Sequence, residues 1–269
     1  MGIVNVTPDS FSGDGVLKIY RQEKVPGLAY ALTLIEDGAD ILDVGGESSR
    51  PGAKVLTAEE EARRVIPLIA ALARRGKVPV SVDTYKPLVA RQALEAGASI
   101  VNVIKGPCIS TRILKDAASF QAGLVLMHMR GTPQTMQVHT KYRDVVADVK
   151  AELRKALKNC RECGIKKENI VVDPGIGFAK TVDQNLVLLQ RLKEFSSLGY
   201  PLLVGTSRKS FIGKTLGLDV SDRLMGTAAT VALAVASGAA IVRVHDVKAM
   251  KQVVLMAHAV VNGGKGIPA

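Results

Sequence analysis

Eight short apolar runs recur along the chain and constrain its fold more than any other feature. They span residues 2–6, 41–44, 80–82, 100–104, 124–127, 170–172, 202–204 and 241–244. Helical stretches separate these runs, and strands that alternate with helices pair in parallel. Eight such units in 269 residues predict an α/β fold, a (β/α)₈ TIM barrel, as a single domain over residues 1–269. A doubly wound sheet would use the same strands, but no Gly-x-Gly-x-x-Gly follows the first run.

Helix ends are marked by glycine and by capping residues. The predicted helices 28–37 and 87–96 end at Gly38 and Gly97, and the helix before the last strand ends at Gly238. Glycine suits the left-handed position that closes a helix. Thr57, followed by acidic residues, is typical of a helix N-cap.

The composition agrees with a barrel of buried strands. Hydrophobic residues make up 47% of the chain and aromatic residues 4%, with no Trp. An interior of Ala, Val, Leu and Ile suits parallel strands covered by helices. Residues 225–242 carry no charge, but hydroxyls and a Ser-Gly break divide them into a helix and a strand. We therefore expect no membrane segment.

Charge and cysteine content indicate the class of partner and the compartment. The net charge of +11 favours anionic ligands, either nucleic acid or small phosphates and carboxylates. No basic patch interleaved with aromatic residues is found, so we expect no nucleic-acid partner. The three cysteines form an odd set, and Cys160-x-x-Cys163 lacks a second pair for zinc. Free thiols in a reducing compartment, the cytoplasm, are expected.

Polar residues follow every predicted strand. In chain order they are Asn5, Asp43 with Glu47, Asp83, Asn102, His128, Asp173, Ser207-Arg208-Lys209, and Arg243 with His245-Asp246. In a parallel barrel these strand ends share one rim, where the active site lies. Helix capping would explain one or two of the carboxylates, but not an arginine and a histidine after the last strands. The sequence therefore predicts an active site at this rim.

These rim residues divide by their chemistry. Arg208, Lys209, Arg243 and His245 supply hydrogen-bond donors from the quarter of such barrels that commonly binds phosphate. An anionic group is expected there. Asp83, Asn102 and Asp173 offer acceptors and an amide that fit a heterocycle with several N–H donors, such as a purine or a pterin. A metal held by the two carboxylates is the alternative, but they lack the histidine partners of a zinc site.

Two glycine-rich loops complete the predicted site. Residues 45–52 contain Gly, Pro and Arg50, and we expect them to form a lid that holds a carboxylate or phosphate. Residues 173–180 keep their backbone free of bulk, and Phe178 is available to stack on a flat ring.

The motifs, taken in order, resemble those of the dihydropteroate synthase family. They are "MGIVNVTPDSFSGDG", "DVGGESSRPGA", "SVDTYKP", "LMHMRGTP", "DPGIGFAKT", "GTSRKSFIG" and "RVHDV", and they cover nearly the whole chain. The resemblance implies a TIM barrel, generally a homodimer, that joins 6-hydroxymethyl-7,8-dihydropterin diphosphate to p-aminobenzoate in folate biosynthesis. The products are 7,8-dihydropteroate and diphosphate.

The resemblance also implies a role for individual residues. Asn5 matches the family's Mg²⁺ ligand, and Arg243 with His245 matches its diphosphate-binding pair. Asp83, Asn102 and Asp173 match the groups that bind the pterin, with Lys209 against it. The pocket for p-aminobenzoate, which sulfonamides also occupy, is matched by Phe11, Ser49, Arg50, Pro51 and Ser210.

In the family the diphosphate leaves first, and the arylamine then attacks the pterin-methyl cation. The resemblance therefore implies that Mg²⁺, Arg243 and His245 stabilise the departing charge, while Asp83 offsets the cation. Residues 7–15 would form a flap that closes over it.

Three departures from the family pattern are visible. Val103 stands where an acid usually follows the asparagine of the fourth strand. The flap carries its acid at Asp14, one position later than usual, and Gly13 and Gly15 give its backbone the freedom to compensate. The chain also starts directly at the first strand. Two competing hypotheses are a pterin-dependent methyltransferase, which would need neither Arg50 nor the Arg243/His245 pair, and a catalytically silent pterin-binding relative.

Overall fold

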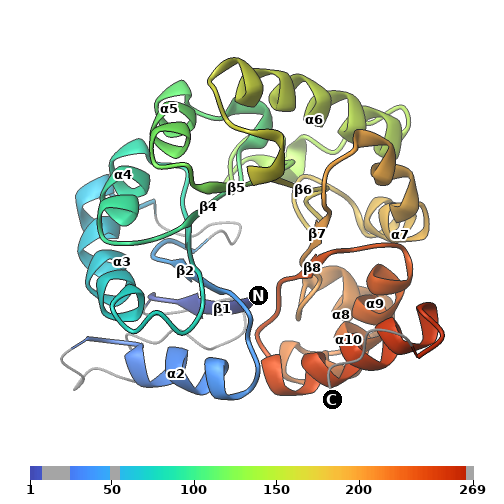
Figure 1. Cartoon of the computed structure of the whole chain (residues 1–269). Coiled ribbons are helices and arrows are strands. Elements are labelled where there is room, and N and C mark those ends of the chain that lie inside the picture. Colours follow the sequence, from blue (N-terminus) through green and yellow to red (C-terminus); the bar gives the residue numbers. More distant parts are fainter. Residues whose placement is uncertain (8–24, 49–54, 265–269) are drawn as a thin grey trace.

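Eight parallel strands form a ring, and the helices lie around its outside (Figure 1). The computed structural model describes residues 1–7, 25–48 and 55–264. The strands are β1 (Gly2–Asn5), β2 (Leu42–Gly45), β3 (Val80–Asp83), β4 (Ile100–Val103), β5 (Gly123–Met127), β6 (Ile170–Asp173), β7 (Leu203–Val204) and β8 (Ile241–Val242). Each lies within two residues of its predicted bounds.

Strand pairing closes the ring and confirms the predicted barrel. Strands β1 to β6 form one sheet in chain order, and β7 pairs with β8. Parallel bridges between Val172 and Leu202 and between Gly2 and Val244 join the two parts. Along the sheet, Asn5 pairs with Gly45, Gly45 with Asp83, and Asp83 with Asn102. The polar ends of β1, β3 and β4 therefore lie at one level, where β2 contributes Gly45.

The helices occupy the stretches between the strands. They are α2 (Leu28–Glu36), α3 (Ala58–Ala73), α4 (Pro87–Glu95), α5 (Thr111–Ser119), α6 (Val145–Glu162), α7 (Val182–Gln190), α8 (Ser210–Leu216), α9 (Leu224–Ala236) and α10 (Val247–Val261). Short 3₁₀ helices are η1 (Gly106–Cys108), η2 (Met136–Val138), η3 (Lys167–Asn169), η4 (Leu192–Leu198) and η5 (Val220–Asp222).

The predicted helix signals are confirmed. Thr57 caps α3: its hydroxyl accepts from the Glu60 amide, and the Glu60 side chain accepts from the Thr57 amide. Gly38, Gly97 and Gly238 have φ values of 96°, 105° and 91°. These left-handed conformations end the helices where the sequence places a residue without a side chain.

The strands bury both faces, and the alternation of side chains decides what enters the barrel. Leu42 and Val44 belong to the apolar core that also contains the inner faces of the helices. The residue between them, Asp43, points the other way and is fully buried. Met1, Val125 and Leu203 form a separate apolar cluster. The polar side chains at the rim are therefore positioned by strands whose other side chains pack in apolar clusters.

Two predictions from composition can be compared with the structure. The three cysteines carry free thiols, as expected. Within the described residues, no helix combines the length and apolar character that a membrane crossing needs. Residues 225–242, the uncharged stretch, form most of α9 and then β8.

Candidate active site

Arg243 lies at the centre of the rim network. It follows β8 directly, and its Nε donates to Asp43 Oδ2 at 2.6 Å while one terminal nitrogen donates to Asp83 Oδ2 at 2.8 Å. Asn102 Nδ2 donates to the same Asp43 oxygen at 2.9 Å. Four strands, β2, β3, β4 and β8, therefore deliver interacting side chains. The structure brings Asp83, Asn102 and Arg243 together at the predicted rim, although the sequence analysis assigned Arg243 to an anion and the other two to a heterocycle.

Asp43 is a site residue to which sequence reasoning gave no role. Its side chain is fully buried, and its Oδ1 has no hydrogen-bond partner among the described residues. A buried carboxylate oxygen without a partner is costly, so Asp43 offers an acceptor to any N–H donor that enters the barrel. The available signal was a charged residue inside an apolar strand, between Leu42 and Val44.

Burial dominates the electrostatics of this network. It raises the pKa of Asp83 to about 7, although Arg243 opposes the shift. Removing the carboxylate from water disfavours its charged form. Burial also tends to lower the pKa of Arg243, but the two facing aspartates outweigh it, and that pKa is raised. Arg243 is thus a permanent cation, whereas Asp83 can change its charge near neutral pH.

Asp173, Lys209 and Phe178 form a second group on the rim. Lys209 precedes α8, and its ammonium lies 4.7 Å from the centre of the Phe178 ring and donates to the Ile176 carbonyl. Burial raises the pKa of Asp173, and Lys209 opposes this shift. Burial lowers the pKa of Lys209 to about 8, and Asp173 opposes that shift in turn. A cation over an aromatic ring beside an acid forms a platform for a flat polar ring.

Two glycines, Gly177 and Gly205, lie beside the Lys209 side chain. A Cβ at Gly205 would lie 3.7 Å from the Arg243 Cβ and 3.8 Å from the Lys209 Nζ, so Gly205 lies between these cations. A Cβ at Gly177 would approach the Lys209 side chain to 2.8 Å, and Gly177 also has a φ of 86°. A side chain at Gly177 would displace the lysine, whereas a Cβ at Gly205 would make ordinary van der Waals contacts.

The remaining donors of the last two strands differ in their partners. His245 is held by Ser207: the His245 amide donates to the Ser207 hydroxyl at 3.1 Å, and His245 Nδ1 lies 2.9 Å from the same oxygen. Arg208 was predicted to contribute to anion binding. Its Nε donates to Asp246 Oδ2 at 2.9 Å, just before α10, and its backbone is left-handed with a φ of 54°; its role in anion binding stays a prediction.

The predicted lid is described only at its two ends. Glu47 Oε2 accepts from the Leu56 amide at 2.8 Å, and the Glu47 carboxylate also binds Tyr85 and Lys86. One carboxylate thus ties residue 47 to residue 56. Ser49, Arg50 and Pro51 lie outside the described residues, as do Phe11 and Asp14. Ser210 is exposed at the start of α8.

Asn5 ends β1 at the rim, and its role as a metal ligand stays a prediction. Across residues 1–7, 25–48 and 55–264, no group of three or more His, Cys, Asp or Glu side chains could hold a metal ion. One amide oxygen on a rigid strand fits Mg²⁺, which keeps several waters and is bound largely through substrate phosphates.

Val103, which stands where an acid is usual in the family, lies in the described part of β4. Val103 is fully buried in the main apolar core. Its side chain therefore packs on the helices and does not enter the barrel, unlike that of its neighbour Asn102.

Comparison with known proteins agrees with this geometry. The family model described as "Pterin binding enzyme" matches residues 1–245. The dihydropteroate synthase of Synechocystis is 48% identical over 260 residues, which cover 96% of this chain and 89% of the relative.

Two solved structures share the fold over nearly the whole chain. Yersinia pestis dihydropteroate synthase with a sulfonamide drug has a TM-score of 0.91 at 38% identity, and the match covers 97% of this chain and 93% of that one. The Clostridium difficile enzyme with pteroic acid has a TM-score of 0.87 at 41% identity, with 97% and 95% covered. With the rim residues in place, these matches show that the chain belongs to the dihydropteroate synthase family of pterin-binding enzymes.

Proposed function

We propose that this protein catalyses the reaction for which its family is named. It is a transferase that condenses 6-hydroxymethyl-7,8-dihydropterin diphosphate with p-aminobenzoate to 7,8-dihydropteroate and diphosphate in folate biosynthesis. The observation that carries the proposal is the division of the rim: Asp43, Asp83, Asn102 and Asp173 supply acceptors and an amide, while Lys209, Arg243 and His245 supply donors.

The acceptor side fits a pterin. A pterin edge presents several N–H donors. Asp173 and the Oδ1 of Asp43, which has no hydrogen-bond partner in the described part of the chain, are buried acceptors inside the barrel. Phe178 and Lys209 lie together at 4.7 Å and would lie against the flat face of the ring. Buried acceptors that receive hydrogen bonds from ring N–H groups discriminate strongly against rings that lack these donors.

The donor side fits the leaving diphosphate. Arg243 uses Nε and one terminal nitrogen for Asp43 and Asp83, and its other terminal nitrogen and His245 would face the anion. A Mg²⁺ ion held by Asn5 would neutralise charge on the diphosphate oxygens. Asp83 would then face the positive charge left on the pterin.

Most residues of the p-aminobenzoate pocket are assigned only by the resemblance to the family. Of Phe11, Ser49, Arg50, Pro51 and Ser210, only Ser210 lies in the described part of the chain. Asp14 and the flap of residues 7–15 likewise stay predictions. Because sulfonamides resemble p-aminobenzoate in shape, we expect them to compete for this pocket.

Purified protein with both substrates and Mg²⁺ should form dihydropteroate, detected by mass spectrometry, and diphosphate, detected by a coupled assay. A chelator should suppress turnover, and added Mg²⁺ should restore it, because the diphosphate then loses and regains its counter-charge. Protein that binds the pterin but makes no product with Mg²⁺ present would support the silent relative. Methyl transfer to an acceptor would support the methyltransferase.

Pterin affinity should depend on pH through Asp83. Burial raises the pKa of Asp83 to about 7, so below that pH the group is protonated and loses its charge beside the bound ring. Affinity should therefore fall as the pH drops from 8 to 6, measured by calorimetry at each pH. Asp83→Asn, which cannot titrate, should bind more weakly at pH 8 and show a flatter profile. A parent-like slope in this variant would assign the titration to another group.

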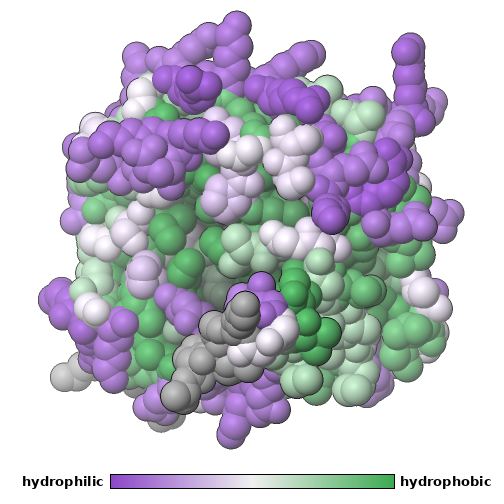
Figure 2. All heavy atoms as spheres, turned by 45° about the vertical axis from the view of Figure 1, so that its right-hand side comes forward, coloured by the Kyte–Doolittle hydropathy of each residue, from purple (hydrophilic) through white to green (hydrophobic). Residues whose placement is uncertain are grey.

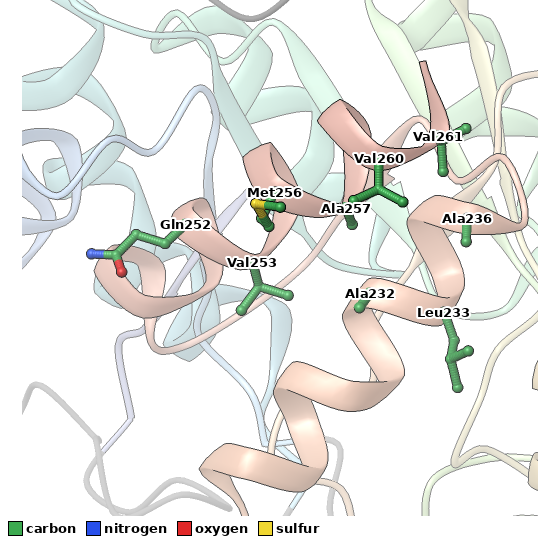
Figure 3. Close-up of a pocket in the computed structure, with 9 residues that line it drawn as sticks. All are labelled: Ala232, Leu233, Ala236, Gln252, Val253, Met256, Ala257, Val260 and Val261. Carbon is green, nitrogen blue, oxygen red and sulfur yellow. The ribbon is translucent and has the colours of Figure 1, made fainter. Parts of the chain in front are cut away.

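We further propose that the protein is a homodimer. Apolar side chains gather on the side of the barrel formed by α9 and α10, as Figure 2 shows in green. Leu233, Met256, Val260 and Val261 are 60%, 65%, 70% and 52% exposed. They line a groove between the two helices (Figure 3). A contiguous apolar surface of this kind marks a protein interface, and a second copy is the occupant that the family suggests.

Met256→Glu should convert the dimer to a monomer, because it would bury two charges at the symmetric contact. Sedimentation equilibrium would measure the mass. Val138→Glu is the matched control, since Val138 is 75% exposed on η2, between β5 and α6, and does not line the groove; it should leave the dimer intact. A parent protein that sediments as a monomer, or a Met256→Glu dimer, would rule out this interface.

The cytoplasm is the proposed compartment. Its support is the set of three free thiols, which persist where the environment is reducing.

A further inference from the structure

Lys180 is a charged residue buried behind the active-site rim. It ends the glycine-rich loop after β6 and is 4% exposed. Charged side chains are almost never buried to this extent without partners. The resemblance gave this lysine no role.

The Lys180 ammonium has three hydrogen-bond partners. Its Nζ donates to the carbonyl oxygens of Gly175 and Phe178 at 2.9 Å and 2.8 Å, and lies 3.2 Å from His128 Nδ1. An ammonium has three donors and no acceptor, so these partners satisfy it fully. Two of them belong to the loop itself, and the third belongs to the residue that follows β5.

His128 carries the contact outward to α6. Burial and the nearby Lys180 lower the pKa of His128 to about 4, so the imidazole is neutral. Its Nδ1 then accepts from Lys180, and its Nε2 donates to Glu152 Oε2 at 3.0 Å. Arg130 Nε binds the other Glu152 oxygen at 2.8 Å. Lys180, His128, Glu152 and Arg130 therefore form a chain in which each donor meets an acceptor.

The loop that Lys180 holds is the one that shapes the pterin platform. Gly175 donates its amide to Asp173 Oδ1 at 2.7 Å, and its carbonyl accepts from both Lys180 and the Phe178 amide. The loop lies so close to β5 that a Cβ at Gly175 would meet the His128 carbonyl oxygen at 1.8 Å. The carbonyl of Ile176 and the ring of Phe178 both contact Lys209.

We propose that Lys180 is a positioning residue: by joining Gly175, Phe178 and His128, its buried ammonium fixes the loop that presents Asp173, Phe178 and Lys209 to the pterin. This inference rests on the proposed function of the rim. Lys180 acts through the loop, because its three hydrogen-bond partners are Gly175, Phe178 and His128.

The test uses Lys180→Met, which keeps the length of the apolar stem and removes the ammonium. Three buried acceptors then lose their donor, so pterin affinity measured by calorimetry should fall about tenfold or more. Lys193→Met removes the same charge from an exposed position and should bind as the parent does. Lys180→Gln, which can still donate to the two carbonyls, should recover part of the affinity and serves as the folded variant if methionine is not tolerated.

Hydrogen exchange separates positioning from general destabilisation. In the Lys180 variants the amides of residues 174–181 should exchange faster, while those of α6 should keep their protection. Equal loss of protection in both regions, or pterin affinity within threefold of the parent in both Lys180 variants, would overturn the inference. Parent protein that makes no dihydropteroate would overturn the proposed function, and the exchange result would then decide the role of Lys180 independently.

Discussion

Arg243→Met should cost this protein both its activity and much of its stability. The guanidinium binds Asp43 at 2.6 Å and Asp83 at 2.8 Å, and Asp43 is fully buried. Removing one partner of a buried ion pair leaves an uncompensated charge, which costs about 3–5 kcal/mol of the free energy of unfolding. Because the same group would face the departing diphosphate, turnover should also fall roughly 100- to 1,000-fold. Denaturant unfolding and steady-state kinetics measure the two effects.

The loss of stability in the Arg243→Met variant should depend on pH. Without the cation, the pKa of Asp83 rises further above its value in the unfolded chain. A carboxyl with a raised folded-state pKa favours the fold while it is protonated, and this contribution is lost as the pH rises through that pKa. The stability deficit should therefore be smaller at pH 6 than at pH 8.

A second variant separates stability from chemistry. Arg243→Met combined with Asp83→Asn removes one of the facing charges, so it should regain stability without regaining turnover. If Arg243→Met is as stable as the parent at pH 8, the two aspartates do not depend on the guanidinium. If it also turns over normally, Arg243 does not bind the diphosphate.

The fold could be predicted because buried parallel strands are apolar on both faces. Residues 170–172, for example, read as a continuous apolar run, and β6 is found at Ile170–Asp173. Glycines at helix ends fixed the joints between elements, as Gly97 does between α4 and β4. The predicted strand bounds differ most from the structure at β8, which ends two residues before the end of the predicted run 241–244. Val244 there forms only an isolated bridge to Gly2, where the ring closes.

The active-site rim was predictable, but the pairing of its side chains was not. Parallel strands place their polar ends at one level, so the sequence indicates which residues share the rim. Which side chains touch depends on the distance across the barrel and on local backbone angles. Asp43 meets Arg243 across the barrel interior, and a left-handed φ turns Arg208 toward Asp246. Neither contact leaves a periodic signal in the sequence.

Buried support residues were missed for a related reason. Lys180 follows the glycine-rich run "DPGIGFA", where a basic residue before a helix is usually a solvated surface group. Only the folded loop shows that its ammonium turns inward to Gly175 and Phe178. His128, predicted as a rim residue, proves to be the partner of this lysine.

Asp173→Asn is expected to weaken pterin binding while leaving the fold nearly unchanged. Asp173 Oδ1 accepts the Gly175 amide at 2.7 Å, and the amide oxygen of asparagine can keep that hydrogen bond. The other carboxylate oxygen becomes an NH₂ group, which would oppose a ring N–H donor. Such a buried mismatch costs about 1–3 kcal/mol, or roughly 5- to 150-fold in affinity.

The loss of charge at Asp173 also acts on Lys209. Asp173 raises the pKa of that lysine against the burial that lowers it to about 8, so without the carboxylate the ammonium should lose its proton at lower pH. Between pH 7 and 8, where ionisation of Asp83 should make the parent bind the pterin more tightly, Asp173→Asn should therefore lose that gain in affinity or bind more weakly. Calorimetry across this range measures the effect, and Asp183→Asn, the same change at an exposed site on α7, is the control.

Unchanged affinity would remove Asp173 from the pterin site. A fall in affinity that tracks a large fall in unfolding free energy would instead make Asp173 a support for the Gly175 turn, and the acceptor role would pass to Asp43, whose buried Oδ1 has no partner among the described residues.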